Sequence, residues 1–293
     1  MRIFYRRLPK FQYIAVRSLD EALAFLAEHR GKAKVLAGGT DLVPQLKKRE
    51  IELPACVVDL KAIPGLDVIS HDRQSGLVLG ALATINAVGQ NRVVEEKFKA
   101  LSQAALSMAS PQVRNRGTIA GNICNAVPSA DSAPALLALN ASVKIKGPKG
   151  ERTVPLDQFF TGPRTTVLGA DELLCEILVP NQDPASRGVY LKLSPRHSMD
   201  LAVVGVAAVG LLEDGICKAV KIALGAVAPT PVRAPMAEAL LTGKVITQGL
   251  IDEAARNALT QCSPIDDHRA SREYRCDMVY AMTRRALAHI FGR

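Results

Sequence analysis

Aromatic residues are scarce in this sequence, which has seven phenylalanines, five tyrosines and no tryptophan among 293 residues. Such a chain has little material for stacking on nucleic-acid bases. Its formal net charge is +9, but the basic residues are scattered and form only short clusters such as Arg6-Arg7 and Lys47-Lys48-Arg49. A solvated basic surface explains this charge better than a nucleic-acid site, so we expect no nucleic-acid partner.

Long apolar runs and metal-binding patterns are also missing. No stretch of about 18 apolar residues could cross a bilayer, and the amino terminus lacks the apolar segment of a signal peptide. The six cysteines show no C-x-x-C pair and no Cys/His spacing typical of zinc or iron-sulfur sites. We therefore expect free, mostly buried thiols, no metal site, and a cytoplasmic protein without a transmembrane segment.

The common phosphate-binding fingerprints are absent as well. Neither G-x-G-x-x-G after a strand nor G-x-x-x-x-G-K-[ST] occurs, which argues against a Rossmann enzyme and against a P-loop NTPase. Apolar residues make up 48% of the chain and charged residues 22%, which is ordinary for a globular protein. The length of 293 residues predicts two or three domains with their own cores.

Helical and strand patterns alternate over the first 180 residues. Ser18 and Glu21 form the S-x-x-E pattern of a capping box, which predicts a helix over 19–30. A strand at 34–37, a Gly-Gly turn and a helix over 42–47 follow. Later strands are expected at 57–60, 76–80 and 173–179, with a hairpin at 141–146 and 151–154. Helices are expected at 84–90, 93–108 and 134–139. Ser110-Pro111 is expected to end the second of these helices, and irregular backbone to follow over 112–131.

A segment with linker composition, 181–188, predicts a domain boundary near residue 182. Beyond it, apolar strands over 201–212 and 216–227 flank a turn, and two helices are expected over 248–261 and 271–291. We thus predict an α+β fold. Its first domain covers 1–181, with subdomains of about 1–55 and 56–181, and its second covers 182–293.

The turn Gly38-Gly39-Thr40-Asp41 joins a predicted strand to a predicted helix. Its two glycines can adopt positive φ and let backbone N–H groups close on an anion, so the turn can bind a phosphate. A Gly-Gly pair between a strand and a helix is, however, more often a plain tight turn. The motif alone does not decide between these interpretations.

The segment 110–131 is long for a connection without regular structure, which is typical of a functional loop. Ala120 and Gly121 allow close approach to the backbone, Thr118 and Asn122 offer hydrogen bonds, and Asp131 can accept one from a ligand hydroxyl or ring N–H. The alternative is a buried crossover in which Asp131 merely caps the helix over 134–139. On the residues alone the two interpretations are evenly matched.

Several segments together resemble one family. The chain resembles the FAD-binding (medium) subunit of the molybdenum hydroxylases, a family that includes carbon monoxide dehydrogenase and xanthine dehydrogenase. The similar segments occur in order along essentially the whole chain: AGGTDL at 37–42, RNRGTIAGNICNAVPSADSAPALLAL at 114–139, KLSPRHSMDLAVVGVAA at 192–208 and ASREYR at 270–275. The resemblance implies a FAD-binding domain of the vanillyl-alcohol-oxidase (PCMH) type, made of two α+β subdomains. A carboxy-terminal α+β domain, a small antiparallel sheet with helices, would follow.

The resemblance also implies which residues bind FAD. Backbone groups of the first loop would hold the pyrophosphate, the second loop would line the flavin and its phosphates, and Asp131 would hydrogen-bond the cofactor. Leu174 would lie on the adenine side and Lys192 near the isoalloxazine edge, although a lysine on a strand edge is usually solvated. The full set is Leu36, Ala37, Gly38, Gly39, Thr40, Asp41, Leu42, Thr118, Gly121, Asn122, Cys124, Asp131, Leu174 and Lys192.

The sequence departs from the family pattern in three places. Ala120 replaces the first glycine of a T-x-G-G-N loop, which could narrow the backbone conformations beside the cofactor. No cysteine-rich insertion occurs between Ala126 and Lys149, so no [4Fe-4S] cluster is expected. His197 and Met199 stand where relatives often carry arginine, which puts the function of that loop in doubt.

The function implied by the resemblance is electron transfer. A large molybdopterin subunit would oxidise the substrate, a small subunit with [2Fe-2S] clusters would relay electrons, and FAD on this chain would pass them to an external acceptor such as NAD or a quinone, in a heterotrimer or its dimer. No catalytic residue is needed on this chain, because the cofactor carries the redox chemistry.

Two other functions stay open. The first is a self-contained FAD-dependent oxidase or dehydrogenase, for which His268 and Tyr274 offer no persuasive base constellation. The second is a basic scaffold or nucleic-acid-binding protein without cofactor.

Overall fold

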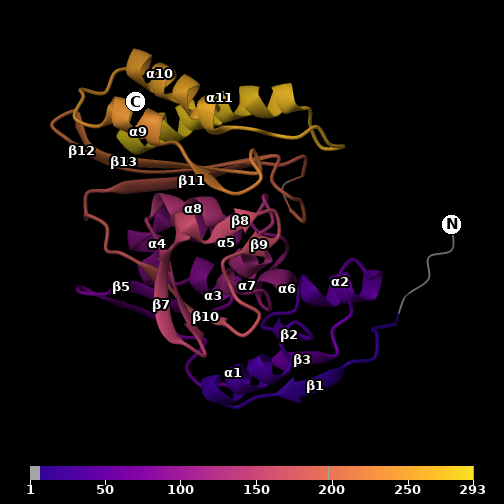
Figure 1. Ribbon diagram of the computed structural model, residues 1–293. Helices are drawn as coiled ribbons and strands as arrows, with labels where there is room; N and C mark the ends of the chain where they lie inside the picture. Colours follow the sequence, from indigo (N-terminus) through magenta and orange to yellow (C-terminus); the bar gives the residue numbers. More distant parts are fainter. Residues whose placement is uncertain (1–6, 197, 293) are drawn as a thin grey trace.

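Three parallel strands form the first sheet, in the spatial order β1-β3-β2. The computed structural model describes residues 7–196 and 198–292, and Figure 1 shows this sheet with α1 at one end of the molecule. The predicted cap is confirmed, since the Ser18 hydroxyl accepts a hydrogen bond from the Glu21 N–H at 3.1 Å. The elements here are β1 (Gln12–Ala15), α1 (Leu19–Glu28), β2 (Ala33–Leu36), α2 (Leu42–Lys48) and β3 (Cys56–Asp59).

Five antiparallel strands form the second sheet, in the order β4-β5-β10-β6-β7. The predicted hairpin across Pro148-Lys149 is confirmed, and the predicted strand at 173–179 lies in the middle of the sheet. The strands are β4 (Ile69–Asp72), β5 (Gly76–Gly80), β6 (Ser142–Gly147), β7 (Gly150–Pro155) and β10 (Leu173–Val179), and a small pair, β8 (Phe160–Gly162) and β9 (Thr165–Thr166), lies apart.

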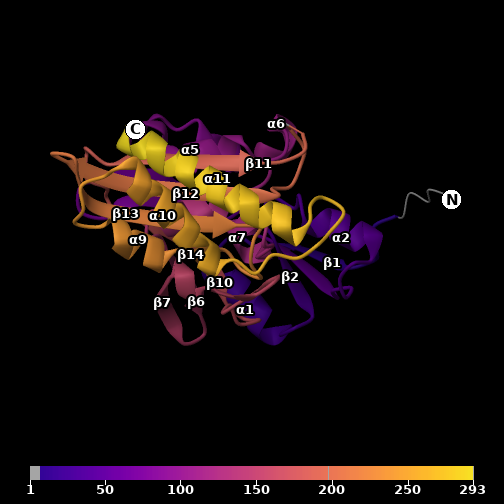
Figure 2. The same cartoon turned by 90° about the horizontal axis from the view of Figure 1, so that it is seen from above.

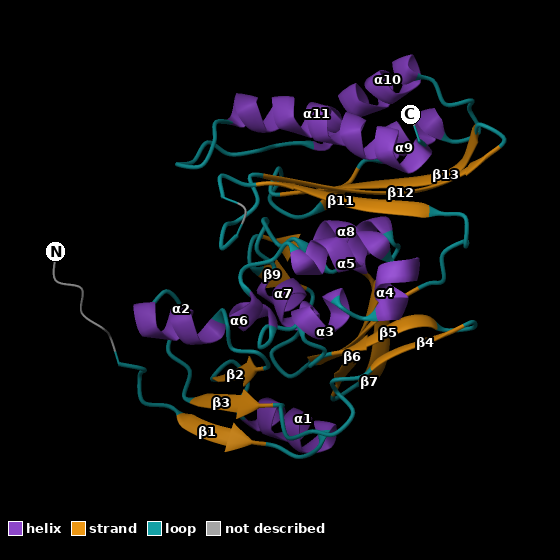
Figure 3. Cartoon of the chain, turned by 180° about the vertical axis from the view of Figure 1, so that it is seen from behind, coloured by secondary structure: helices purple, strands orange, loops and turns teal. Residues whose placement is uncertain are grey.

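A layer of short helices separates the second sheet from the third, as Figure 3 shows. These helices are α3 (Ile85–Gly89), α4 (Arg92–Lys97), α5 (Lys99–Leu106), α6 (Pro111–Arg114), α7 (Ile119–Asn125) and α8 (Ser132–Ala138). Each has few turns, so its stability comes from packing against its neighbours rather than from its own hydrogen bonds. Helices α5 and α8 pack against the third sheet, and α7 packs against β10 of the second.

The third sheet is antiparallel, in the order β11-β12-β13-β14, and α9, α10 and α11 cover its outer face (Figure 2). The predicted hairpin and both terminal helices are confirmed. The sequence prediction missed β11, β14 and α9. The elements are β11 (Arg187–Leu193), β12 (Val204–Glu213), β13 (Ile216–Gly225), β14 (Val232–Arg233), α9 (Pro235–Leu241), α10 (Gln248–Ala258) and α11 (Arg272–Phe291).

Three sequence predictions about the middle helices are wrong. The single helix over 93–108 is broken at Phe98, whose φ of −128° and ψ of 44° are not helical. The segment 112–131 is not irregular, because it contains α6 and α7. Ser110 and Pro111 begin α6 instead of ending a helix: Ser110 caps it and Pro111 takes the first turn, where its missing N–H costs nothing.

The inner face of the third sheet shares its core with the helical layer. Tyr190, Ala207 and Ala223 belong to the same buried apolar cluster as the residues of α5 and α8. Small residues allow this close contact, since a Cβ on Gly225 would lie 2.7 Å from Pro134 Cγ of α8. The two regions therefore pack as one body. No helix in the described ranges is long and apolar enough to cross a membrane.

Arg275, the last residue of the ASREYR segment, ties the outer helices to the third sheet. Its side chain is 3% exposed and donates to the carbonyl oxygens of Val203 and Ala226, at 2.6 and 3.2 Å. It also pairs with Asp267 Oδ1 at 2.8 Å. Burial raises the pKa of Asp267, but hydrogen bonds from the Arg269 and Ala270 N–H groups and from Arg275 outweigh this and lower it to about 2.

We expect Arg275→Met to lower the free energy of unfolding by about 3 to 5 kcal/mol, because it leaves two carbonyls without this donor and removes the buried partner of the Asp267 carboxylate. Urea denaturation of the full chain measures this. Arg284→Met is the matched control on the same helix, since Arg284 pairs with Asp252 at the surface and should cost no more than about 1 kcal/mol.

The ion pair between Arg275 and Asp267 makes the stability lost in Arg275→Met depend on pH. The folded pKa of Asp267 lies below the unfolded value of about 3.9, so its stabilisation is complete above that pH and is lost as the pH falls towards 2. The stability difference between wild type and Arg275→Met should shrink over this range. A difference that stays constant from pH 5 to pH 2 would show that the ion pair contributes nothing.

Candidate functional site

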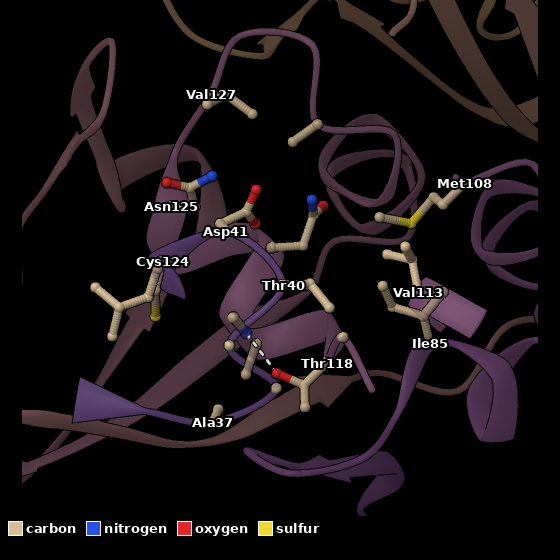
Figure 4. Close-up of a pocket in the computed structure, with 18 of the residues that line it drawn as sticks. Ala37, Thr40, Asp41, Ile85, Met108, Val113, Thr118, Cys124, Asn125 and Val127 are labelled. Carbon is tan, nitrogen blue, oxygen red and sulfur yellow. Dashed lines mark hydrogen bonds between the residues drawn. The ribbon is translucent and has the colours of Figure 1, made fainter. Parts of the chain in front are cut away.

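A cavity of about 470 Å³ opens between the first sheet, the helical layer and the segment 199–201 that follows β11. The turn after β2 forms one wall, α7 forms the opposite wall, and the start of β10 closes one end. Figure 4 shows Ala37, Thr40 and Asp41 from the first loop gathered with Thr118, Cys124 and Asn125 from the second. Segments about 80 residues apart in sequence thus share one site.

The two glycine-containing loops touch through their backbones at Gly38. A Cβ placed on Gly38 would lie 2.1 Å from the carbonyl oxygen of Arg116 and 2.8 Å from Gly117 Cα. Only glycine lets the two backbones come this close, because the atoms that a Cβ would meet belong to the backbone and cannot move aside. Gly117 in turn faces Thr40, whose Oγ1 would be 3.1 Å from a Cβ there. The turn after β2 therefore packs directly against the backbone that leads into α7.

Different constraints require glycine at the two positions of the turn. Gly39 has a φ of +75°, as predicted, whereas Gly38 does not adopt positive φ and serves the contact with Arg116 instead. Within the described residues, the N–H groups of Gly38, Gly39, Thr40 and Asp41 donate no hydrogen bond to the protein. A row of free backbone donors lining a cavity is suited to anionic oxygens.

The start of α7 forms the second wall. The Thr118 hydroxyl accepts a hydrogen bond from the Gly121 N–H at 2.9 Å, drawn as a dashed line in Figure 4, and so caps the helix. Asn122 Oδ1 accepts one from the Ser132 hydroxyl at 2.6 Å, which fixes its amide. Ala120 lies inside this helix without positive φ and is 3% exposed, so an alanine is free of strain there.

Asp131 does not cap α8. It occupies the N-cap position, but its side chain makes no capping hydrogen bond. Its carboxylate instead accepts from the Tyr190 hydroxyl at 2.6 Å and pairs with Lys192 Nζ at 2.9 Å. Lys192 is 10% exposed in its side chain, so the expectation that an edge-strand lysine is solvated is wrong.

Asp131 is 6% exposed, and its ion pair joins the helical layer to β11 of the third sheet. Lys192 also donates to the Ser107 carbonyl at 3.2 Å. Burial raises the pKa of Asp131, against the lowering effect of Lys192 and of the Tyr190 hydrogen bond. The Asp131 carboxylate thus lines the cavity and is held in place by its ion pair with Lys192.

The sequence-predicted site residues come together with one exception. All of them except Lys192 line the cavity, and Lys192 reaches it through Asp131. The prediction did not name several other residues that line the cavity: Ala81, Ile85, Met108 and Leu168, from segments with no recognised motif, and Val113 and Glu172, from segments that the sequence did single out.

The segment after β11 borders the cavity. Met199, Asp200 and Leu201 line it, and Met199 has a φ of +57° with 56% of its surface exposed. The Met199 N–H and the Ser198 hydroxyl both donate to the Ala109 carbonyl, at 3.3 and 3.2 Å, which anchors this segment. His197, the other departure from the family pattern, lies outside the described residues.

His268 and Tyr274, the residues considered for a self-contained enzyme, do not line the cavity. Both are exposed, on or just before α11. Among residues 7–196 and 198–292, no group of three or more His, Cys, Asp or Glu side chains is arranged to hold a metal ion. The cavity offers a ligand backbone donors, small side chains and carboxylates, among them Asp131 with its partner Lys192.

Comparisons with known proteins cover nearly the whole chain. Residues 9–182 match the family described as "FAD binding domain in molybdopterin dehydrogenase", and residues 189–290 match "CO dehydrogenase flavoprotein C-terminal domain". The chain is 36% identical over 285 residues to the carbon monoxide dehydrogenase medium chain of Hydrogenophaga pseudoflava, covering 97% of this chain and 98% of that one. It is 32% identical over 277 residues to a putative xanthine dehydrogenase FAD-binding subunit of Escherichia coli, covering 94% of each.

Solved structures of related oxidoreductases have the same fold as this chain. Carbon monoxide dehydrogenase from Hydrogenophaga pseudoflava lacking the Mo-pyranopterin moiety matches with a TM-score of 0.94 and 37% identity, over 98% of this chain and 99% of that chain. Quinoline 2-oxidoreductase from Pseudomonas putida 86 matches with a TM-score of 0.91 and 31% identity, over 98% of each.

We expect the Cys124 thiol, which lines the cavity, to be unreactive near neutral pH. Burial raises its pKa to about 12, so almost none of it is thiolate, the form that attacks thiol reagents. Titration with a disulfide reagent at pH 8 should give the same number of fast-reacting thiols in wild type and in Cys124→Ala. The loss of one fast thiol in the variant would contradict this.

Proposed function

The chain belongs to the FAD-binding medium subunits of the molybdenum hydroxylases, and on that basis we propose that the cavity between its two glycine loops holds the FAD. The observation that carries the proposal is the row of free N–H groups from Gly38 to Asp41, set against the start of α7 across one cavity. Its volume of about 470 Å³ lies within the usual range for ligand sites.

Each predicted contact fits part of a dinucleotide. The free amides of Gly38, Gly39 and Thr40 suit the pyrophosphate, because they offer donors without a side chain in the way. Thr118, Gly121, Asn122 and Cys124 leave room for a flat ring beside α7. Leu174 supplies an apolar surface towards the adenine end, and Asp131 with Lys192 supplies the charged groups near the ring.

When bound, FAD supplies the electron transfer, as it does in flavoproteins generally. The chain's own residues bind it, orient it and set the charge around it. No acid, base or nucleophile of this chain is required. Because the fold and family are those of an electron-transfer subunit, we set aside the self-contained oxidase and the cofactor-free scaffold.

We infer that this chain works with two further subunits, a small one with [2Fe-2S] clusters and a large one with molybdopterin, in a heterotrimer or its dimer. Electrons would pass from the clusters to FAD and on to an external acceptor such as NAD or a quinone. The family resemblance supports this assembly, and a cytoplasmic location would suit it. We further propose that the chain divides near residue 182, just before β11, with subdomains of about 1–55 and 56–181 in the first part.

We expect Gly38→Ala to weaken FAD binding by at least about tenfold, which corresponds to about 1.4 kcal/mol. The added Cβ would overlap the Arg116 carbonyl, so the two loops must separate and the row of amides is displaced from the opposite wall. Titration of the full-length apoprotein with FAD, followed by flavin fluorescence, measures the change.

Gly249→Ala is the matched control for this experiment. Gly249 lies on α10, and a Cβ there would meet nothing within 4 Å, so FAD affinity should be unchanged. Equal affinity in Gly38→Ala and wild type would show that FAD does not depend on this loop contact. A wild-type chain that neither carries flavin absorbance nor binds added FAD would overturn the proposed function.

A further inference from the structure

Tyr190 is a buried polar residue beside the cavity for which the FAD-binding proposal has no role. It lies on β11 two residues before Lys192, so both side chains point from the same face of the strand towards the helical layer. Its hydroxyl donates to Asp131 Oδ1, while Lys192 Nζ lies 2.9 Å from Oδ2. Each oxygen of the carboxylate therefore has its own donor from the third sheet.

The packing around Tyr190 fixes its hydroxyl. The residue is 6% exposed, and its N–H donates to Gln103 Oε1 of α5 at 2.9 Å. On the neighbouring strand, a Cβ on Gly205 would lie 2.7 Å from the Tyr190 hydroxyl oxygen. The hydroxyl thus occupies space that any larger residue at 205 would take, and it has little freedom to turn away from Asp131.

The charge on Asp131 depends on these two donors. Burial raises its pKa, and only Lys192 and the hydroxyl of Tyr190 act in the opposite direction. Burial and the nearby carboxylate also raise the pKa of Tyr190 well above its usual value, so the tyrosine stays protonated and acts as a donor. The other carboxylates lining the cavity have basic neighbours of their own: Asp41 near Arg164, Glu172 with Arg152, and Asp200 with Arg196.

We propose that Tyr190 is a positioning residue that holds Asp131 as a carboxylate against Lys192, so that FAD meets a neutralised ion pair instead of a net positive charge. This rests on the proposed binding of FAD in the cavity that Asp131 lines. Without the hydroxyl, Asp131 takes up a proton at higher pH. The charge on Lys192 is then no longer balanced and favours the reduced flavin, which is anionic.

The test is the midpoint potential of FAD bound to the full-length chain, measured by reductive titration against a redox dye between pH 6 and pH 9. In Tyr190→Phe the affinity for reduced FAD relative to oxidised FAD should rise about tenfold at the acidic end, a shift of about 30 mV to more positive potential for a two-electron couple. The difference should close at the alkaline end, where Asp131 is ionised in both proteins.

Two further variants separate this role from general damage. Gly205→Ala moves the hydroxyl without changing Tyr190 or Asp131, so it should shift the potential in the same direction even if Tyr190→Phe folds poorly. Tyr274→Phe is the matched control, because Tyr274 is 45% exposed and does not line the cavity. It should leave the potential at the wild-type value.

The possible outcomes are distinct. Potentials equal to wild type at every pH in Tyr190→Phe and Gly205→Ala would overturn the inference while leaving FAD binding intact. Weaker binding of both oxidation states by the same factor would also overturn it, because that result indicates a purely structural role. Failure of the wild-type chain itself to bind FAD would instead reject the proposed function.

Discussion

The contact on which the site depends is the one between the Gly38 backbone and the carbonyl of Arg116. It brings the turn after β2 against the segment that leads into α7, with no side chain between them. Because both partners are backbone, the spacing of the cavity walls is set by the chain itself and not by flexible side chains. The hydrogen bond from Gln45 to Asn125, at 3.3 Å, adds a second link between α2 and α7. The first sheet is thereby held in a fixed position against the helical layer.

The third sheet is joined to this assembly by a buried charge. A carboxylate on the helical side, Asp131, meets Lys192 and Tyr190 from β11, and small residues such as Gly205 and Gly225 let the layers approach. Breaking such a pair by removing one partner leaves the other charge buried and is costly, which favours a single arrangement of the layers. The carboxy-terminal region therefore does more than cover the core, since it supplies the groups that fix a charge at the cavity wall.

Much of the fold followed from local patterns. The cap at Ser18, the Pro148-Lys149 hairpin and the apolar runs of β12 and β13 each carry their signal within a few residues. The failures came where local signals compete. Phe98 ends one helix and precedes the next, and Thr118 and Ser110 were interpreted as loop residues although they are helix caps. Strand β11 was missed because its alternation is weak and it starts within a segment of linker composition.

For the candidate site, the sequence singled out the two loops and the acidic residue through their resemblance to one family. On the residues alone, a plain tight turn and a buried crossover stayed open, because glycine, threonine and aspartate serve such structures as well as a ligand site. It could not show that Gly38 is needed for contact with Arg116, that Asp131 pairs with Lys192 instead of capping α8, or that Tyr190 takes part at all. These facts depend on distances between residues about 60 to 80 positions apart. Only the packing of three layers fixes such distances, since a sequence pattern records what a residue can do and not which partner the folded chain brings to it.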